Sequence, residues 1–312
     1  MRSALLLSAC VGLIACSGDH LPAPPVPGQS TAKFNRLLFA GDVMLSRGVR
    51  RQILASGDPA LPFRKIGPLL AGADLAFVNL ESPFSDQGPY HPDGLIFHAA
   101  PPMIAGLALS HIAVASTANN HSRDCGAHGV DFTLHWLCSH GITPVGSSES
   151  AEQTHRGMIL VRNGIRFGFL GYTYDQQNGN WRDLDERIAL ADPAFVSRDV
   201  KALRQRCDVV IVSMHHGIEY ALKPSKQQVM FAHAAIDAGA TLVIGHHPHV
   251  IQPREMYKGG LIFYSLGNFV FDQFQRQATQ HGEIAEVDFL GRGIFVANVW
   301  PVKITSTGPQ LE

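Results

Sequence analysis

The stretch LVIGHHPHVIQ (242–252) decides the fold. Its apolar run, 242–244, stops at Gly245 and is followed at once by three histidines within four residues, His246, His247 and His249. A continuous apolar run of this kind is typical of a strand buried on both faces. Four further runs end in the same way, at a side chain able to bind metal: 37–40 before Asp42, 75–78 before Asn79 and Glu81, 112–115 before Asn120 and His121, and 209–212 before His215.

Helical patterns alternate with these runs, and the alternation predicts an α/β fold. Asn163-Gly164 is a strong type I′ turn signal and predicts a hairpin between the runs that flank it. We find no repeat and no internal linker, so we expect a single domain over residues 36–305. The predicted helices cover about 49–54, 130–140 and 227–238, the hairpin strands 158–161 and 166–171, and further strands 261–264 and 284–299.

Composition narrows the class of protein. The chain has 312 residues and 46% hydrophobic residues, which is enough to bury a core and excludes a disordered chain. Its formal net charge of −1 argues against a nucleic-acid partner, because phosphate binding needs a surplus of Lys and Arg. The unusual quantity is 16 histidines in a chain with only 16% charged residues.

The N-terminus predicts export. Residues 1–15 combine a basic start with a short apolar run, as in a secretory signal peptide. Leu13-Ile14-Ala15-Cys16 resembles a bacterial lipobox, so we expect lipidation of Cys16 and a lipoprotein anchored at the cell membrane. Ser17 favours the periplasmic side of the outer membrane if the source is Gram-negative. Residues 16–35 then form a Pro-rich tether; the alternative is an ordinary signal peptide.

Three cysteines remain beyond this segment: Cys125, Cys138 and Cys207. None stands in a CxxC spacing, so neither a thiolate zinc site nor a disulfide framework is indicated. A Cys125–Cys138 disulfide could form in an oxidising compartment, but we do not predict it. We expect Cys138 and Cys207 to pack as small apolar groups.

The strand-end side chains predict one shared site. In open α/β sheets, sites form outside the carboxyl ends of the strands, so five runs deliver polar groups to one edge. Carboxylate, amide oxygen and imidazole together suit Mn, Fe, Zn or Mg rather than a thiolate metal. Taken singly, Asp42 could instead cap a helix and His215 could be a buried structural histidine; the repetition favours the shared site.

The ordered motifs resemble the CapA family of poly-γ-glutamate capsule biosynthesis proteins. The resemblance implies a calcineurin-like metallophosphoesterase fold, a four-layer α/β sandwich of two mixed β-sheets flanked by helices. It implies metal ligation by Asp42, Asn79, Glu81, Asn120, His215, His247 and His249, with His216 and His246 as weaker neighbours. The motifs are GDVMLSR (41–47), VNLE (78–81), ANNHSRDCG (118–126), MHHGIEY (214–220), GHHPHVIQ (245–252) and YSLGNFVFD (264–272).

Two departures from a standard phosphoesterase of that superfamily concern the metal. Met44 stands where the first motif usually carries His, and the acid of the second motif is Glu81 rather than Asp. CapA-like chains share both changes. One expected ligand is therefore missing, and we expect one ion or a weakly held pair.

These residues predict a metal-dependent hydrolase or transferase. A metal at Asp42 and Glu81 would polarise a carbonyl or phosphoryl oxygen, with His121 as general acid or base. We place these three residues in the catalytic set. Loop 82–100 is either a substrate-covering loop or an ordinary surface excursion. Arg47 could instead be a surface charge on a helix, and Asp272 could line the site. The predicted substrate contacts are Arg47, Asn119, Asp124 and Glu219.

The function expected from the resemblance is a metal-dependent hydrolase-like site acting on an amide, peptide or γ-glutamyl substrate at the cell envelope. One alternative is a non-catalytic, polymer-binding subunit of a capsule synthesis or export complex with membrane partners; another is a phosphoesterase. A polymerising ligase is disfavoured, because no Gly-rich ATP-binding loop with its Lys occurs.

Overall fold

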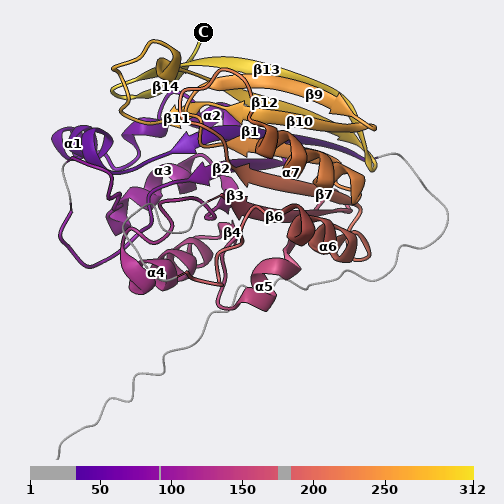
Figure 1. Cartoon of the computed structure of the whole chain (residues 1–312). Coiled ribbons are helices and arrows are strands. Elements are labelled where there is room, and N and C mark those ends of the chain that lie inside the picture. The colour runs from indigo at the N-terminus through magenta and orange to yellow at the C-terminus, as the bar shows by residue number, and fades with distance from the viewer. Residues whose placement is uncertain (1–32, 91–92, 175–183) are drawn as a thin grey trace, which may run out of the picture.

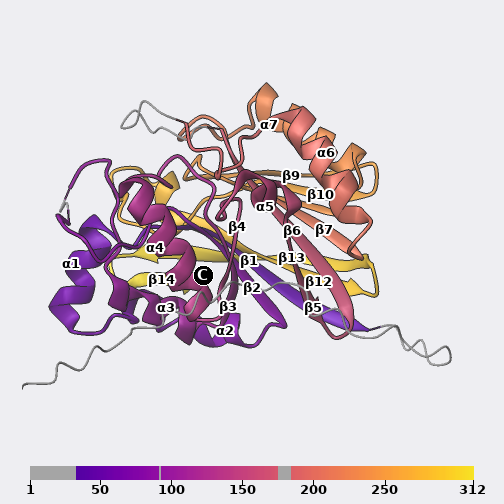
Figure 2. The same ribbon diagram turned by 90° about the horizontal axis from the view of Figure 1, so that it is seen from below.

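The computed structural model describes residues 33–90, 93–174 and 184–312. Two mixed β-sheets pack face to face, and helices cover the outer face of each (Figure 1; Figure 2). The predicted four-layer α/β sandwich is confirmed.

The first sheet has the order β14-β13-β12-β1-β2-β3-β4. The strands from β1 to β4 pair in parallel, and those from β1 to β14 on the other side pair antiparallel. In addition, β11 pairs in parallel with the end of β1. The parallel strands are β1 (Phe34–Val43), β2 (Leu75–Leu80), β3 (Ile112–Ser116) and β4 (Thr143–Val145); the others are β11 (Asn268–Val270), β12 (His281–Leu290), β13 (Gly293–Thr305) and β14 (Gly308–Leu311).

The second sheet has the order β5-β6-β7-β8-β10-β9. The predicted hairpin joins β5 to β6, and Asn163 and Gly164 have φ of 45° and 73°, as a type I′ turn requires. The strands are β5 (Met158–Arg162), β6 (Ile165–Thr173), β7 (Val209–His215), β8 (Leu242–His246), β9 (Ile251–Tyr257) and β10 (Gly260–Leu266).

Helices α1 to α4 lie on the first sheet, and α6 and α7 lie on the second. Ser225 and Gln228 form a capping box at the start of α7. The α-helices are α1 (Arg47–Ser56), α2 (Gly67–Ala71), α3 (Ile104–Leu109), α4 (Gly126–Ser139), α5 (Ala151–Arg156), α6 (Pro193–Arg204) and α7 (Lys226–Asp237). The 3₁₀ turns are η1 (Leu61–Phe63), η2 (Pro101–Met103) and η3 (Ala278–Gln280).

The four layers explain why the strands read as continuous apolar runs. Along β1, Leu37 and Phe39 face the second sheet, whereas Leu38 and Ala40 face the helices. All four are fully buried, because successive side chains of a strand point to opposite faces and both faces are covered here.

The ordered elements extend beyond 36–305 at both ends, since β1 begins at Phe34 and β14 pairs with β13 up to Leu311. Cys125 and Cys207 are free thiols, so no Cys125–Cys138 bridge forms; Cys207 packs against α6, as predicted. No helix of the described residues is both long and apolar enough to cross a bilayer. The predicted signal peptide, Cys16 and the tether up to residue 32 lie outside the described residues.

Candidate metal centre

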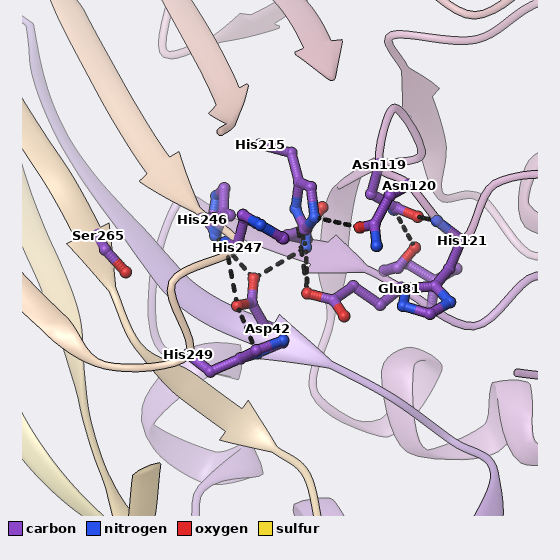
Figure 3. Close-up of polar contacts among 12 residues, drawn as sticks. Asp42, Glu81, Asn119, Asn120, His121, His215, His246, His247, His249 and Ser265 are labelled. Atoms are coloured by element: carbon purple, nitrogen blue, oxygen red, sulfur yellow. Dashed lines mark hydrogen bonds and ion pairs between the residues drawn. The ribbon is translucent and has the colours of Figure 1, made fainter. Parts of the chain in front are cut away.

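The carboxyl ends of strands from both sheets meet at one edge of the sandwich (Figure 3). Asn79 follows Phe77 on the face of β2 that points to the second sheet, and His246 follows Ile244 in the same way on β8. The apolar layer between the sheets therefore ends in a buried polar layer at this edge.

Asp42 is fully buried and contacts four other residues of this layer. Its Oδ1 accepts a hydrogen bond from Asn79 Nδ2 at 2.8 Å and lies 3.3 Å from His246 Nδ1. Its Oδ2 accepts from the His247 backbone N–H at 3.3 Å and lies 3.4 Å from His249 Nδ1. Burial raises the pKa of Asp42, but the His246 and His249 imidazoles outweigh it and hold this pKa well below its ordinary value.

Glu81 provides a second buried carboxylate. Its Oε1 lies 3.3 Å from Asn79 Nδ2 and 3.9 Å from His215 Nδ1. Burial, together with the Asp42 carboxylate, raises the pKa of Glu81 well above its ordinary value. Ligand atoms of Asp42, Glu81 and His249 lie within 4.8 Å of one another. Two buried carboxylates this close call for a cation between them.

The remaining predicted ligands lie around the triad of Asp42, Glu81 and His249. His215 Nε2 lies 2.8 Å from Asn120 Oδ1, and its ring centroid lies 4.9 Å from that of His247. Burial lowers the pKa of His247 to about 3 and that of His215 well below its ordinary value. Both imidazoles are therefore neutral, which is the form that binds metal. The structure thus brings all seven predicted ligands into one cluster.

Buried polar atoms without a hydrogen bond show that this cluster fits a divalent ion. Within the described residues they include Asn79 Oδ1, Glu81 Oε2, His247 Nδ1 and both ring nitrogens of His246. Leaving such atoms unpaired is costly, and oxygen and imidazole donors are those that Mn, Fe, Zn and Mg accept. Met44, in contrast, is buried as an apolar side chain, and its Sδ accepts a bond from Ser46 N.

The backbone that carries the histidines is strained. His247 and His249 have φ of 96° and 58°, a region that non-glycine residues rarely occupy. Gly245 precedes them where a Cβ would lie 2.0 Å from the Tyr264 carbonyl oxygen. Strain of this kind persists when the surrounding structure over-determines it, and it clusters at functional sites.

His121 lies beside the cluster (Figure 3), and Asp124 orients its ring. His121 Nδ1 is 2.7 Å from Asp124 Oδ2, and its ring stacks on Phe97 with centroids 3.8 Å apart. Asp124 Oδ2 also accepts from Phe97 N at 2.6 Å. The Asn119 side chain is committed to backbone, since its Nδ2 donates to Leu80 O and its Oδ1 accepts from His121 N.

Arg47 and Glu219, predicted to contact substrate, differ in setting. Arg47 forms an ion pair with Asp272, donates to Gly94 O at 3.1 Å and lies over the Phe97 ring at 4.7 Å. It therefore ties loop 82–100 to the segment after β11. Glu219 is exposed, on the loop between β7 and α7.

Three residues at the site were not predicted as members. Asn268 Oδ1 lies 3.0 Å from His249 Nδ1, although Asn268 stands in the quoted motif YSLGNFVFD and could have been singled out. The Tyr174 ring lies 4.5 Å from His247, and the Tyr220 ring 6.4 Å from His249. Tyr220 ends the quoted motif MHHGIEY and could also have been singled out, whereas Tyr174 lies outside the quoted motifs.

Comparison with known structures supports the fold. A novel phosphatase from Mycoplasma pneumoniae aligns with a TM-score of 0.55 at 13% identity over 89% of this chain and 95% of that one. The NAD nucleotidase of Haemophilus influenzae aligns with a TM-score of 0.52 at 12% identity over 90% and 60%. The chain thus shares the architecture of these phosphatase and nucleotidase structures.

Comparison of sequences identifies the family. The profile described as "Bacterial capsule synthesis protein PGA_cap" matches residues 36–273. "Capsule biosynthesis protein CapA" of Bacillus anthracis is 30% identical over 92% of this chain and 71% of that protein. "PGA biosynthesis protein CapA" of Bacillus subtilis (strain 168) is 32% identical over 75% and 63%. The chain belongs to the PGA_cap family of bacterial capsule synthesis proteins, as its motifs predicted.

Proposed function

We propose that this chain is a metal-dependent hydrolase that cleaves an amide bond in an envelope polymer or peptide, with a γ-glutamyl linkage as the first substrate to test. One observation carries the proposal: the buried Asp42, Glu81 and His249 triad lies beside a histidine held by a carboxylate. The names of the relatives, which refer to capsule and PGA biosynthesis, support the choice of substrate.

Asp42, Glu81 and His249 would hold the ion, with His215 and His247 next to them. When bound, a divalent cation polarises the scissile carbonyl oxygen and neutralises the charge that develops on it. The two asparagines of the cluster orient their neighbours: Asn79 binds Asp42, and Asn120 binds His215.

His121 would move the proton. Asp124 accepts the hydrogen bond of His121 Nδ1 and so leaves Nε2 as the atom that exchanges protons. In amide hydrolysis, the water oxygen bonds to the carbonyl carbon, the C–N bond breaks and the leaving nitrogen takes a proton. His121 Nε2 would accept a proton from the attacking water and pass it to the leaving nitrogen, so that the protons balance. Phe97 covers one face of the ring and fixes its plane.

Export and lipidation at Cys16 would place this chemistry at the cell envelope, within reach of membrane-bound capsule-synthesis subunits. The lipobox-like LIAC sequence and the Pro-rich segment after it support this location. Labelling cells with a palmitate analogue tests it: wild-type chain should carry the label, and the Cys16→Ala variant should not. A labelled Cys16→Ala chain would contradict lipidation at this residue.

The enzymatic proposal is tested by metal analysis and turnover on two substrates. Purified chain should contain a divalent metal and release glutamate from a γ-linked glutamate oligomer, and His249→Ala should lose both properties. His233→Ala is the matched control, because His233 pairs with Glu255 on the outer side of the second sheet. Metal without turnover would favour the accessory, polymer-binding role. Turnover of p-nitrophenyl phosphate alone would favour a phosphoesterase.

A further inference from the structure

The rim of the metal centre beside His249 is formed by two segments, residues 216–225 after β7 and residues 271–280 after β11. Tyr220 projects from the first and Arg276 from the second, and the Arg276 guanidinium carbon lies 4.4 Å from the centre of the Tyr220 ring. Because Tyr220 is itself 6.4 Å from the His249 ring, this cation lies one aromatic ring away from a metal-binding side chain.

Tyr220 is held rigidly in this position. Its φ of 66° lies in the left-handed region, which is unfavourable for an aromatic residue. The strain is offset by a hydrogen bond from its N–H to Pro248 O at 2.8 Å. The buried Gln252 side chain also holds this loop, because its Nε2 donates to the carbonyl oxygens of Ala221 and Lys223 at 2.7 and 3.1 Å.

The segment that carries Arg276 is tied to the metal centre. Thr279 Oγ1 donates to the Arg276 carbonyl oxygen at 2.9 Å, and the Thr279 carbonyl accepts from Asn268 Nδ2 at 3.0 Å. Asn268 is the residue that contacts His249 Nδ1. A short chain of hydrogen bonds thus fixes the position of Arg276 relative to that of His249.

The two arginines near the site differ in their partners. Arg47 is committed to Asp272, but Arg276 is exposed, and no Asp or Glu in the described part of the chain forms an ion pair with it. An exposed guanidinium stacked on a ring presents a planar set of N–H donors that matches a carboxylate in a bidentate arrangement. Cation–π stacking reduces the conformational freedom that binding would otherwise remove.

We propose that Arg276, seated on Tyr220, is a carboxylate-binding subsite that aligns an anionic polymer across the metal centre. The inference rests on the proposed function, in which such a polymer is the substrate. A neighbouring acid limits the positive charge here: burial and the Glu219 carboxylate together raise the pKa of Tyr220. One arginine next to one acid suits a singly charged carboxylate better than a doubly charged phosphate.

The test measures binding apart from turnover. The full chain is titrated, with metal chelated, with a fluorescent γ-linked glutamate oligomer and with the same oligomer after amidation of its free carboxylates. Arg276→Gln should weaken binding of the charged oligomer about tenfold and leave binding of the amidated oligomer unchanged. Arg276→Lys should fall in between, because it keeps the charge but loses the planar donors. Glu219→Gln should tighten binding of the charged oligomer.

Arg292→Gln is the matched control. It removes the same charge from an exposed arginine that pairs with Asp208, and it should bind the charged oligomer as wild type does. Three results would overturn the inference: unchanged binding in Arg276→Gln, no binding by the wild type, or competition by inorganic phosphate that exceeds competition by free glutamate oligomer. Restoring metal then tests the proposed function separately, because an oligomer that binds through Arg276 but is not cleaved contradicts only the hydrolase proposal.

Discussion

Two His–Asp pairs in this molecule have nearly the same geometry and different surroundings. His121 Nδ1 lies 2.7 Å from Asp124 Oδ2, and His155 Nδ1 lies 2.6 Å from Asp199 Oδ2. The first pair is buried beside the metal centre, with the His121 ring on Phe97. The second joins α5 to α6, on the outer side of the second sheet.

The partners of the two aspartates show why only one pair is suited to catalysis. Asp199 also accepts from the Tyr172 hydroxyl at 2.9 Å and from Arg198 Nε at 2.8 Å, so its charge is shared among three donors. Two of them, Tyr172 and His155, join α6 to β6 and to α5. Asp124 orients a histidine that faces a cluster of metal-binding groups. The neighbours of a His–Asp pair, rather than its own geometry, therefore decide what it does.

The largest expected difference between the pairs is in turnover. His121→Ala should lower kcat on the γ-linked oligomer by about 10²- to 10⁴-fold, the usual contribution of a general acid or base. His155→Ala should change kcat by less than about twofold, because it lies away from the metal cluster. Steady-state kinetics with equal metal content checks both. Equal losses of kcat in the two variants would contradict a catalytic role that belongs to His121 and not to His155.

Asp124→Asn should have the next largest effect. An amide can donate to His121 Nδ1 and so favour the wrong tautomer, which should lower kcat about 10- to 100-fold and leave KM nearly unchanged. The pH profile of kcat should shift as well, a change that a purely structural role would not produce. Asp199→Asn, measured in parallel, should keep the wild-type profile.

Asp199→Ala should act on stability instead. The buried Tyr172 hydroxyl loses its acceptor, and the free energy of unfolding should fall by about 1–3 kcal/mol. Urea denaturation measures this change, and kcat of the folded fraction should stay at the wild-type value. Asp237→Ala, which breaks an exposed pair with Lys258, should lower the free energy of unfolding far less, because solvent screens an exposed ion pair. A similar loss in both variants would contradict the structural role of Asp199.

The last expected effect concerns stability against acid when no metal is bound. Burial holds the pKa of His247 at about 3, against an ordinary value of 6.5, so the unfolded chain binds its proton first as pH falls. Stability should therefore decrease from about pH 6.5 toward pH 3, by at most about 1.4 kcal/mol per pH unit for this group. The measurement is urea denaturation of the chelated protein from pH 7 to pH 5. His247→Gln should reduce the dependence of the free energy of unfolding on pH, and His155→Gln should not.

Much of the fold was predictable from sequence, because burial on both faces leaves continuous apolar runs and Asn163-Gly164 permits one kind of turn. That the seven predicted ligands lie together was also predictable, because parallel strands bring their carboxyl ends to one edge of the sheet. The role of Arg47 was not predictable. Arg47 meets Asp272 across 225 residues, and the His155 pair spans 44, so neither contact has a local signal. Tyr220 and Arg276 depend on loop conformation, which periodicity does not encode.

The candidate metal centre is assembled from distant parts of the chain. Asp42 and the His247 backbone that contacts it are 205 residues apart, and β11 must also dock beside β1. A growing chain that does not yet include β8 and β11 cannot form this arrangement of side chains. An ion bound at this site would therefore come from the compartment in which folding finishes, not from the one in which translation begins. A chain that crosses a membrane unfolded would take its metal from the far side.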